Sequence, residues 1–179
     1  MKQRLLIVDG YNMIGAWPEL LSLKKRDEIG LARDELLRIL SDYAAREELI
    51  VLVVFDAQLV EGIEQMFDEY NLSVVFTKEG ETADSYIERT VKELLSPLIT
   101  LTVATSDLAE QCVVFQQGAL RQSARELYRA IQVSKQNLES ESKEIQQQLK
   151  RRNSPWHPSQ LITLNQLLKD LSEQGQHKK

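Results

Sequence analysis

Apolar residues along the chain occur as short continuous runs separated by longer stretches with helical spacing. The continuous runs cover 4–8, 49–55, 72–77 and 99–105, with a shorter one at 112–115. Runs of this length without polar alternation are typical of strands buried on both faces. The first run ends in "VDGYNM", where an acid, a glycine, an aromatic residue and an amide follow the apolar residues.

Between the runs, apolar residues recur at intervals of three and four. One such stripe lies in 25–47 and another in 81–95, and each predicts an amphipathic helix. Strands that alternate with helices need crossover connections. The pattern therefore predicts an α/β fold with a mainly parallel sheet covered by helices on both faces.

The C-terminal third follows a different pattern. Ser123 and Glu126 form a capping-box signature that opens a long helix. Its apolar stripe thins from about residue 135, and the prolines of "RRNSPWHPSQL" end it before a last amphipathic helix that Ser159 can cap. We expect one domain over 1–133 and a C-terminal helical extension over 134–179, packed on that domain or projecting from it.

Composition places the protein in a broad class. A chain of 179 residues suits one domain with an appended element. Its only cysteine, Cys112, excludes an internal disulfide and fits a reducing compartment; the valines beside it predict a buried thiol. Asp9 interrupts the first apolar run, so no signal peptide is expected, and no later run could span a membrane. We expect a soluble cytoplasmic protein.

Charge is distributed unevenly along the chain. The net charge is −5, yet residues 121–152 carry eight basic against four acidic side chains, which leaves −9 for the remainder. Such an asymmetry can orient a polyanion. Arg121 and Arg125, at the start of the basic stretch, are the candidate residues to bind it. A solvated helix of mixed charge is the alternative.

Four acids stand at strand ends or at a helix start: Asp9, Asp56, Asp84 and Asp107. The carboxyl ends of parallel strands share one edge of a sheet, so these side chains are expected to converge. Clustered carboxylates repel one another unless protons or a cation compensate. An all-oxygen site without Cys or His suits Mg²⁺ or Mn²⁺, which can activate water to cleave a phosphodiester.

Several neighbouring residues are candidates for supporting this site. Gly10 is expected to allow a tight turn after the first strand, which brings the Asn12 amide near Asp9 to orient water or a substrate phosphate. Ser106 can donate to a phosphate or cap a helix. Glu81 lies in a first helical turn, where the helix dipole stabilises an acid. Glu88 is interpreted as a solvated residue on the surface of the helix.

The segments "VDGYNMI", "VFDA", "TKEGETADSYIE", "VATSD" and "GALRQSARELYRAI" together resemble the YacP-like branch of the NYN nucleases, within the PIN-like superfamily, over about residues 3–133. The resemblance implies a three-layer α/β/α sandwich and metal-dependent endoribonuclease cleavage of single-stranded RNA, without a nucleotide cofactor. It also implies that the substrate is mRNA and that the ribosome is a partner.

Carried over onto this sequence, the resemblance implies a set of site residues. The implied catalytic residues are Asp9, Asn12, Asp56, Asp84 and Asp107. The implied ligands of Mg²⁺ or Mn²⁺ are Asp9, Asp84 and Asp107, with Glu81 beside them. Asn12, Ser106, Arg121 and Arg125 are the candidate substrate-binding residues.

Two other functions compete with this one. A non-catalytic RNA- or ribosome-binding module could keep the acids only to hold an ion. An aspartate-nucleophile phosphatase would need a second acid two residues after Asp9, where this chain has Tyr11.

Overall fold

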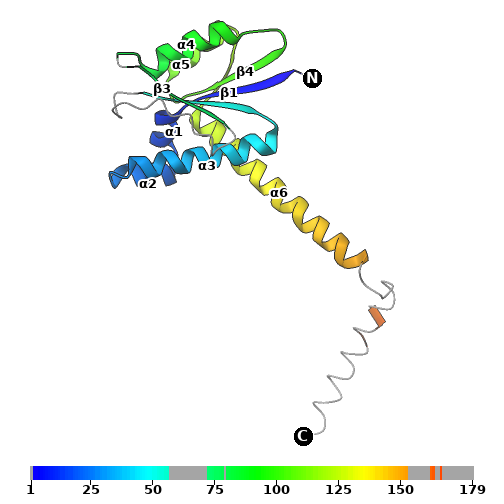
Figure 1. Cartoon of the computed structure of the whole chain (residues 1–179). Coiled ribbons are helices and arrows are strands. Elements are labelled where there is room, and N and C mark those ends of the chain that lie inside the picture. Colours follow the sequence, from blue (N-terminus) through cyan, green and yellow to red (C-terminus); the bar gives the residue numbers. More distant parts are fainter. Residues whose placement is uncertain (1, 57–71, 79, 153–161, 164–165, 167–179) are drawn as a thin grey trace. The chain divides into compact units, whose positions relative to one another are not determined.

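A computed structural model describes residues 2–56, 72–78, 80–152, 162–163 and 166 (Figure 1). The chain divides into two units, residues 1–135 and 136–179. The described elements run in the order β1 (Gln3–Asp9), α1 (Gly10–Ala16), α2 (Pro18–Lys25), α3 (Ile29–Glu47), β2 (Ile50–Phe55), β3 (Ser73–Phe76), α4 (Ala83–Leu94), β4 (Ile99–Ala104), α5 (Leu108–Gln116), β5 (Leu120–Gln122) and α6 (Ala124–Arg152). The predicted α/β class is confirmed.

The five strands form one parallel sheet in the order β3-β2-β1-β4-β5. β1 lies at the centre, with Asp9 opposite Val54 of β2 and Val8 opposite Ala104 of β4. Because all the strands run the same way, their carboxyl ends meet at one edge, as the alternation of strands and helices predicted.

Helices cover both faces of the sheet, which makes three layers (Figure 1). Leu6 and Val8 of β1 pack with residues of α1, α2, α3 and the start of α6, whereas Ile7 packs with α4 and α5. Side chains along a strand alternate between the faces. Asp9 therefore shares the face of Ile7, on the side of α4 and α5.

The first turns of α6 belong to the first unit and are fixed to it by polar contacts. The Trp17 indole N–H donates to the Ala124 carbonyl oxygen at 2.9 Å, and the Ser134 hydroxyl donates to Glu47 at 2.7 Å. The capping box predicted at Ser123 and Glu126 is present: the Ser123 N–H donates to the Glu126 carboxylate and the Glu126 N–H donates to the Ser123 hydroxyl.

The structure corrects several sequence predictions. The run 112–115 is part of helix α5 and not a strand, and Cys112 is exposed, because α5 turns this residue away from the sheet. α1, α2 and the three-residue edge strand β5 were not predicted. The prolines predicted to end the long helix, and the last helix predicted after Ser159, lie almost wholly outside the described residues.

Among the described residues, none of the helices has the length and the apolar content that crossing a membrane requires.

Gly10 is required for close packing and not for a tight turn. It is the first residue of α1, and a Cβ at this position would lie 2.2 Å from Cε1 of Phe55. Phe55 is fully buried, with its ring edge-on to Tyr11 and stacked on Phe76, so it has no open space to move into. Gly10 therefore lets α1 begin directly against β2 beside the end of β1.

Replacing Gly10 by alanine should lower the free energy of unfolding by about 1–3 kcal/mol, the usual cost of overpacking a core. Gly15→Ala is the matched control, because a Cβ at Gly15 of the same helix meets nothing within 4 Å. That variant should match the parent or exceed it by about 0.5–1 kcal/mol. Equal stability of the two variants in denaturant titrations would refute the packing role of Gly10.

Candidate metal centre

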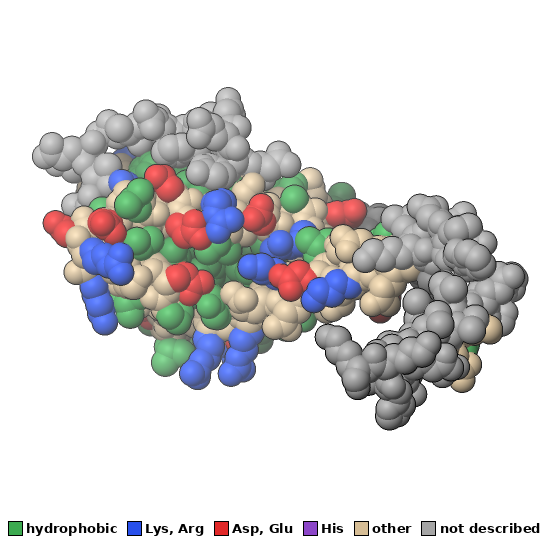
Figure 2. All heavy atoms as spheres, turned by 90° about the horizontal axis from the view of Figure 1, so that it is seen from below, with side chains coloured by type: hydrophobic (Ala, Val, Ile, Leu, Met, Phe, Trp, Pro, Cys, Tyr) green, Lys and Arg blue, Asp and Glu red, His purple; other side chains and the backbone are tan. Residues whose placement is uncertain are grey.

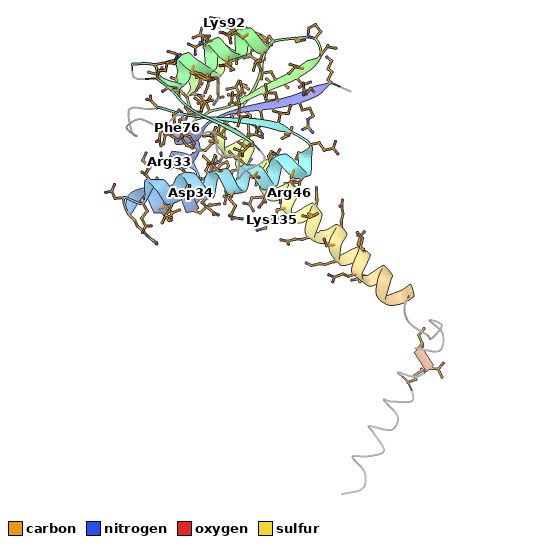
Figure 3. The ribbon with its side chains drawn as sticks, viewed as in Figure 1. Arg33, Asp34, Arg46, Phe76, Lys92 and Lys135 are labelled. Carbon is orange, nitrogen blue, oxygen red and sulfur yellow. The ribbon has the colours of Figure 1, made fainter. Side chains whose placement is uncertain are left out.

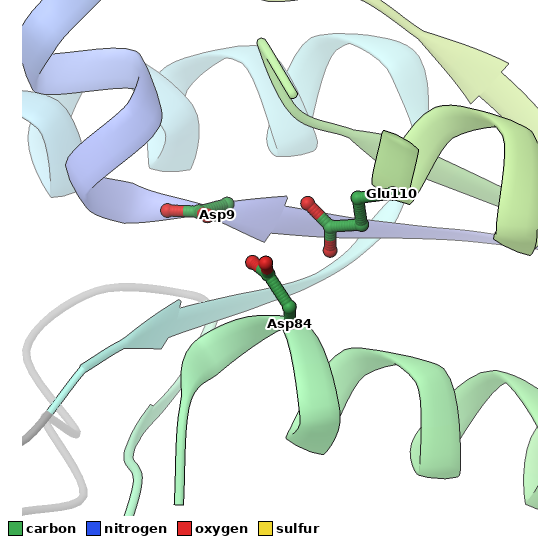
Figure 4. Close-up of side chains that lie close together, drawn as sticks. All are labelled: Asp9, Asp84 and Glu110. Carbon is green, nitrogen blue, oxygen red and sulfur yellow. The ribbon is translucent and has the colours of Figure 1, made fainter. Parts of the chain in front are cut away.

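Three carboxylates from three different elements converge at the carboxyl edge of the sheet (Figure 4). Asp9 ends β1, Asp84 lies in the first turn of α4, and Glu110 lies in the first turn of α5. One oxygen from each of the three lies within 4.8 Å of the others. Asp9 and Glu110 are buried and Asp84 is exposed, so the cluster has one side open to solvent.

Asp9 is held by the start of α1. Its Oδ1 accepts the Asn12 backbone N–H at 3.0 Å, which caps the helix, and its Oδ2 accepts the Asn12 side-chain amide at 2.5 Å. The amide of Asn12 thus orients the carboxylate of Asp9 itself. An acid capping a helix N-terminus also gains from the helix dipole.

Asp84 is positioned by the packing and capping of α4. Thr82 caps the helix by accepting the Ser85 N–H at 3.2 Å, while Ala83 and Ile87 bury the apolar face against the sheet. With those two residues facing the sheet, Asp84 projects from the first turn toward the end of β1 (Figure 4).

Glu110 is the site residue that sequence reasoning missed. Ser106 was a candidate helix cap, but the run 112–115 was interpreted as a strand and no helix was predicted over 108–116, so nothing placed Glu110 at this edge; the residue that caps α5 is Asp107. A signal was available: Asp107 followed three residues later by Glu110 fits a capping box. In the structure the Asp107 N–H donates instead to the Thr105 hydroxyl at 3.1 Å, and Glu110 points toward Asp9 and Asp84.

The electrostatics of the cluster favour protons or a cation. Burial raises the pKa of Glu110 to about 7, the Thr105 side chain opposes the shift, and the charges of Asp84, Asp9 and Asp107 add to it. Burial likewise raises the pKa of Asp9, against its hydrogen bonds from Asn12. The pKa of Asp84 is raised by burial and then by the charges of Asp107 and Asp56.

The donor set fits a hard divalent cation. Both carboxylate oxygens of Glu110 are buried, and the Thr105 side chain, which opposes the rise in the Glu110 pKa, does not meet hydrogen-bond distance and angle to either oxygen among the described residues. A buried acid without a partner is costly, and a cation held by three carboxylates would supply the missing interaction. The cluster can therefore hold a metal ion through these three residues.

Asp107 and Asp56 lie near the cluster without belonging to it. Asp107 is exposed and caps α5, with its Oδ1 accepting the Ala109 N–H at 2.7 Å. Asp56 follows β2 and is half-buried. Both act on Asp84 through their charge, so they stand at the rim of the site.

The other acids on α4 and before it face elsewhere. Glu81 forms an ion pair with Arg89, and Glu88 pairs with Lys92 at 2.8 Å and accepts a hydrogen bond from Gln117 at 3.2 Å. The prediction that Glu88 is a solvated surface residue fits these contacts. Glu81 is engaged in this ion pair and is not one of the three carboxylates that converge within 4.8 Å.

The candidate substrate-binding residues lie on different elements and differ in their contacts. Ser106 donates to the Asn12 carbonyl oxygen at 3.3 Å, which ties the end of β4 to α1. Arg121 donates to the Gln111 side chain at 3.0 Å, and Gln111 donates to the Thr105 carbonyl oxygen at 2.9 Å. This chain of contacts holds Arg121 close to α5, whereas Arg125 is an exposed residue in the first turns of α6.

Elsewhere on the first unit the surface charge is mixed. The side that carries α3 presents acidic and basic side chains together (Figure 2), and on α3 Arg38 pairs with Glu35 and Asp42 at 2.6 and 3.5 Å. Asp9, Asp84 and Glu110 differ from these, because none of the ion pairs among the described residues includes them.

The raised pKa of Glu110 predicts how stability depends on pH in chelator. The folded protein keeps this proton up to about pH 7, whereas an unfolded chain loses it near 4.5. Stability is therefore fully present below about pH 4.5 and falls as the pH rises through about 7, by about 3 kcal/mol for a shift of this size. Glu110→Gln should remove most of this fall in denaturant titrations between pH 5 and 8.

Glu93→Gln, at an exposed glutamate of α4, provides the control and should follow the parent at every pH. If the parent and Glu110→Gln show the same dependence on pH, Glu110 does not carry the uncompensated charge.

The sequence and the fold both match known proteins. The sequence model of the YacP-like NYN domain family matches residues 6–169 of this chain. The YacP protein of Bacillus subtilis (strain 168) is 45% identical over 141 residues, which cover 79% of this chain and 82% of that protein.

Two crystal structures of Rae1 (YacP) from Bacillus subtilis share the fold, each with a TM-score of 0.69. The W164L mutant is 41% identical, and the match covers 81% of this chain and 85% of the mutant chain. The other structure is 38% identical, and the match covers 97% of this chain and 95% of that chain. An NYN domain implies a nuclease-like, RNA-related role. By its sequence, its fold and the extent of both matches, this chain belongs to the YacP-like NYN domain family.

Proposed function

We propose that the protein is an endoribonuclease that cleaves single-stranded RNA with Mg²⁺ or Mn²⁺ as cofactor. One observation carries the proposal: Asp9, Asp84 and Glu110 bring three carboxylates to within 4.8 Å at the edge where an α/β sheet binds its ligands. Membership of the NYN family supports RNA as the substrate class.

Each residue of the site has a distinct part in this proposal. Asp9, Asp84 and Glu110 hold the cation, and Asn12 keeps Asp9 oriented toward it. A bound divalent cation would activate water and stabilise the charge on the leaving oxygen of a phosphodiester. Asp107 and Asp56, at the rim, would orient the attacking water or the waters around the cation.

The polar residues beside the cluster offer contacts for the RNA backbone. Arg121 is held near α5 by Gln111 and can bind a phosphate on the side of β4. Arg125, Ser106 and Asn12 are the other candidate contacts. The most specific part of the proposal is that the substrate is mRNA, cut on the translating ribosome in the cytoplasm. This part is supported by the family resemblance.

A non-catalytic RNA-binding module is the second candidate. It would need the same basic and polar contacts and would use the three carboxylates only to hold an ion, which does not require the solvent-exposed side at Asp84. The convergence of Asp9, Asp84 and Glu110 favours catalysis over this alternative.

Asp84→Asn should abolish RNA cleavage, because it removes one of three charges that hold the cation, while the fold stays intact. The assay follows single-stranded mRNA cut in Mg²⁺ or Mn²⁺ and uncut in chelator, with free RNA and with translating ribosomes as separate arms. Glu88→Gln, one turn further along α4 and paired with Lys92, is the matched control and should cut like the parent.

Cleavage by Asp84→Asn at the parent's rate in both arms would reject the assignment. RNA that is bound but never cut would favour the non-catalytic module.

Metal should also stabilise the fold. A cation that binds only the folded protein raises its stability by about 2.7 kcal/mol at a concentration one hundred times the dissociation constant. Mn²⁺ or Mg²⁺ should therefore raise the melting temperature of the parent at pH 7.5, and should do so far less for Asp84→Asn or Glu110→Gln. In chelator Asp84→Asn should melt no lower than the parent, since it relieves repulsion. A large drop in chelator would instead identify Asp84 as a structural residue.

A further inference from the structure

An aromatic column lies at the same edge of the sheet, on the face opposite the metal centre. Phe55 ends β2 and Phe76 ends β3, and both pack in the core that includes α1 and α3. Their rings stack at 5.3 Å, and Tyr11 of α1 meets Phe55 edge-on at 5.1 Å. The column runs from fully buried Phe55 to half-buried Phe76, so it leads from the core toward the surface.

Arg33 of α3 extends this column. Its guanidinium carbon lies 5.7 Å from the centre of the Phe76 ring, and the two side chains lie side by side in Figure 3. No carboxylate of the described residues forms an ion pair with Arg33, in contrast to Arg38 further along α3. The Tyr11 hydroxyl is buried beside it: burial raises the pKa of Tyr11, and the charge and side chain of Arg33 oppose that shift.

The column is close to the metal centre. Tyr11 is two residues from Asp9 in the turn that leads from β1 into α1. Val54 lies opposite Asp9 in the pairing of β1 with β2, and the next residue along β2 is Phe55. The inner end of the column therefore lies beside Asp9, and a strand of RNA crossing the edge of the sheet can reach both places.

We propose that Arg33, supported by Phe76, stacks on a base of single-stranded RNA next to the bond that is cut at the metal centre. An unpaired base has a polarisable face, and proteins bind such faces with aromatic rings and with planar guanidinium groups. Arg33 offers that plane, and it lies over the Phe76 ring, which in turn stacks on Phe55. This inference rests on the proposed nuclease function and adds the recognition of a base beside the scissile phosphate.

The test measures binding of a labelled single-stranded RNA by fluorescence anisotropy, in a chain carrying Asp84→Asn so that the RNA stays intact. One base at a time is replaced by an abasic nucleotide. At one position this change should weaken binding about tenfold, the usual worth of a stacked base. Arg33→Lys keeps the charge but loses the plane, so it should weaken binding of intact RNA about as much and erase the effect of that abasic position.

Matched variants separate stacking from other roles. Arg38→Lys, on the same helix, should behave like the parent, and Phe76→Tyr should keep the abasic effect that Phe76→Leu loses. The opposite result is that Arg33→Lys binds RNA like the parent, while Arg33→Gln binds weakly whichever position of the RNA is abasic. Arg33 would then contact phosphate, and the inference would be overturned. Thermal melts of each variant exclude a loss of fold as the cause.

Cleavage assays of the parent chain, with Arg33 and Asp84 both intact, keep the two proposals distinguishable when they are read beside the binding data. RNA bound with the abasic effect but never cut in Mg²⁺ or Mn²⁺ supports the base subsite and rejects the nuclease. RNA cut normally by a chain without any abasic effect rejects the subsite and supports the nuclease. RNA that is not bound at all rejects both.

Discussion

Repulsion among three carboxylates at one edge of the sheet is the constraint on which the rest of the site depends. Asp9 and Glu110 are buried, and an oxygen of each lies within 4.8 Å of the other and of Asp84. At an effective dielectric of about 20, two unit charges about 4 Å apart repel by about 4 kcal/mol. A fold stable by only about 5–15 kcal/mol keeps such an arrangement only if protons or a cation compensate it.

The fold reduces this cost by placing acids at the starts of helices. Asp9 caps α1, Asp107 caps α5, and Asp84 and Glu110 occupy first turns. The positive end of a helix dipole and its free N–H groups favour a negative charge there. In a parallel sheet with right-handed crossovers, the helix that follows each strand begins at the carboxyl edge. The topology that gathers the acids therefore also provides part of their stabilisation.

Much of this arrangement could be predicted from the sequence, and the failures have physical causes. The buried strands and the long helices gave clear apolar patterns, and acids at their ends indicated one shared edge. Glu110 was missed because α5 is short and apolar, so the run at 112–115 resembled a strand. α1 was missed because a seven-residue helix with two glycines has a weak pattern, and its start depends on packing against Phe55. Which acids meet depends on side-chain directions, and those follow from helix capping that spacing alone did not settle.

The two faces of the edge have different chemistry: acids lie on the side of α4 and α5, and an arginine on aromatic rings lies on the side of α1 and α3. The central claim is that Asp9, Asp84 and Glu110 hold the metal of this site. A crystal structure with Mn²⁺, located by its anomalous scattering, tests it most directly. The account predicts a peak bound by an oxygen of each of these three residues at about 2.0–2.2 Å. A peak held by Asp107 and Asp56, with Glu110 turned away, would contradict it.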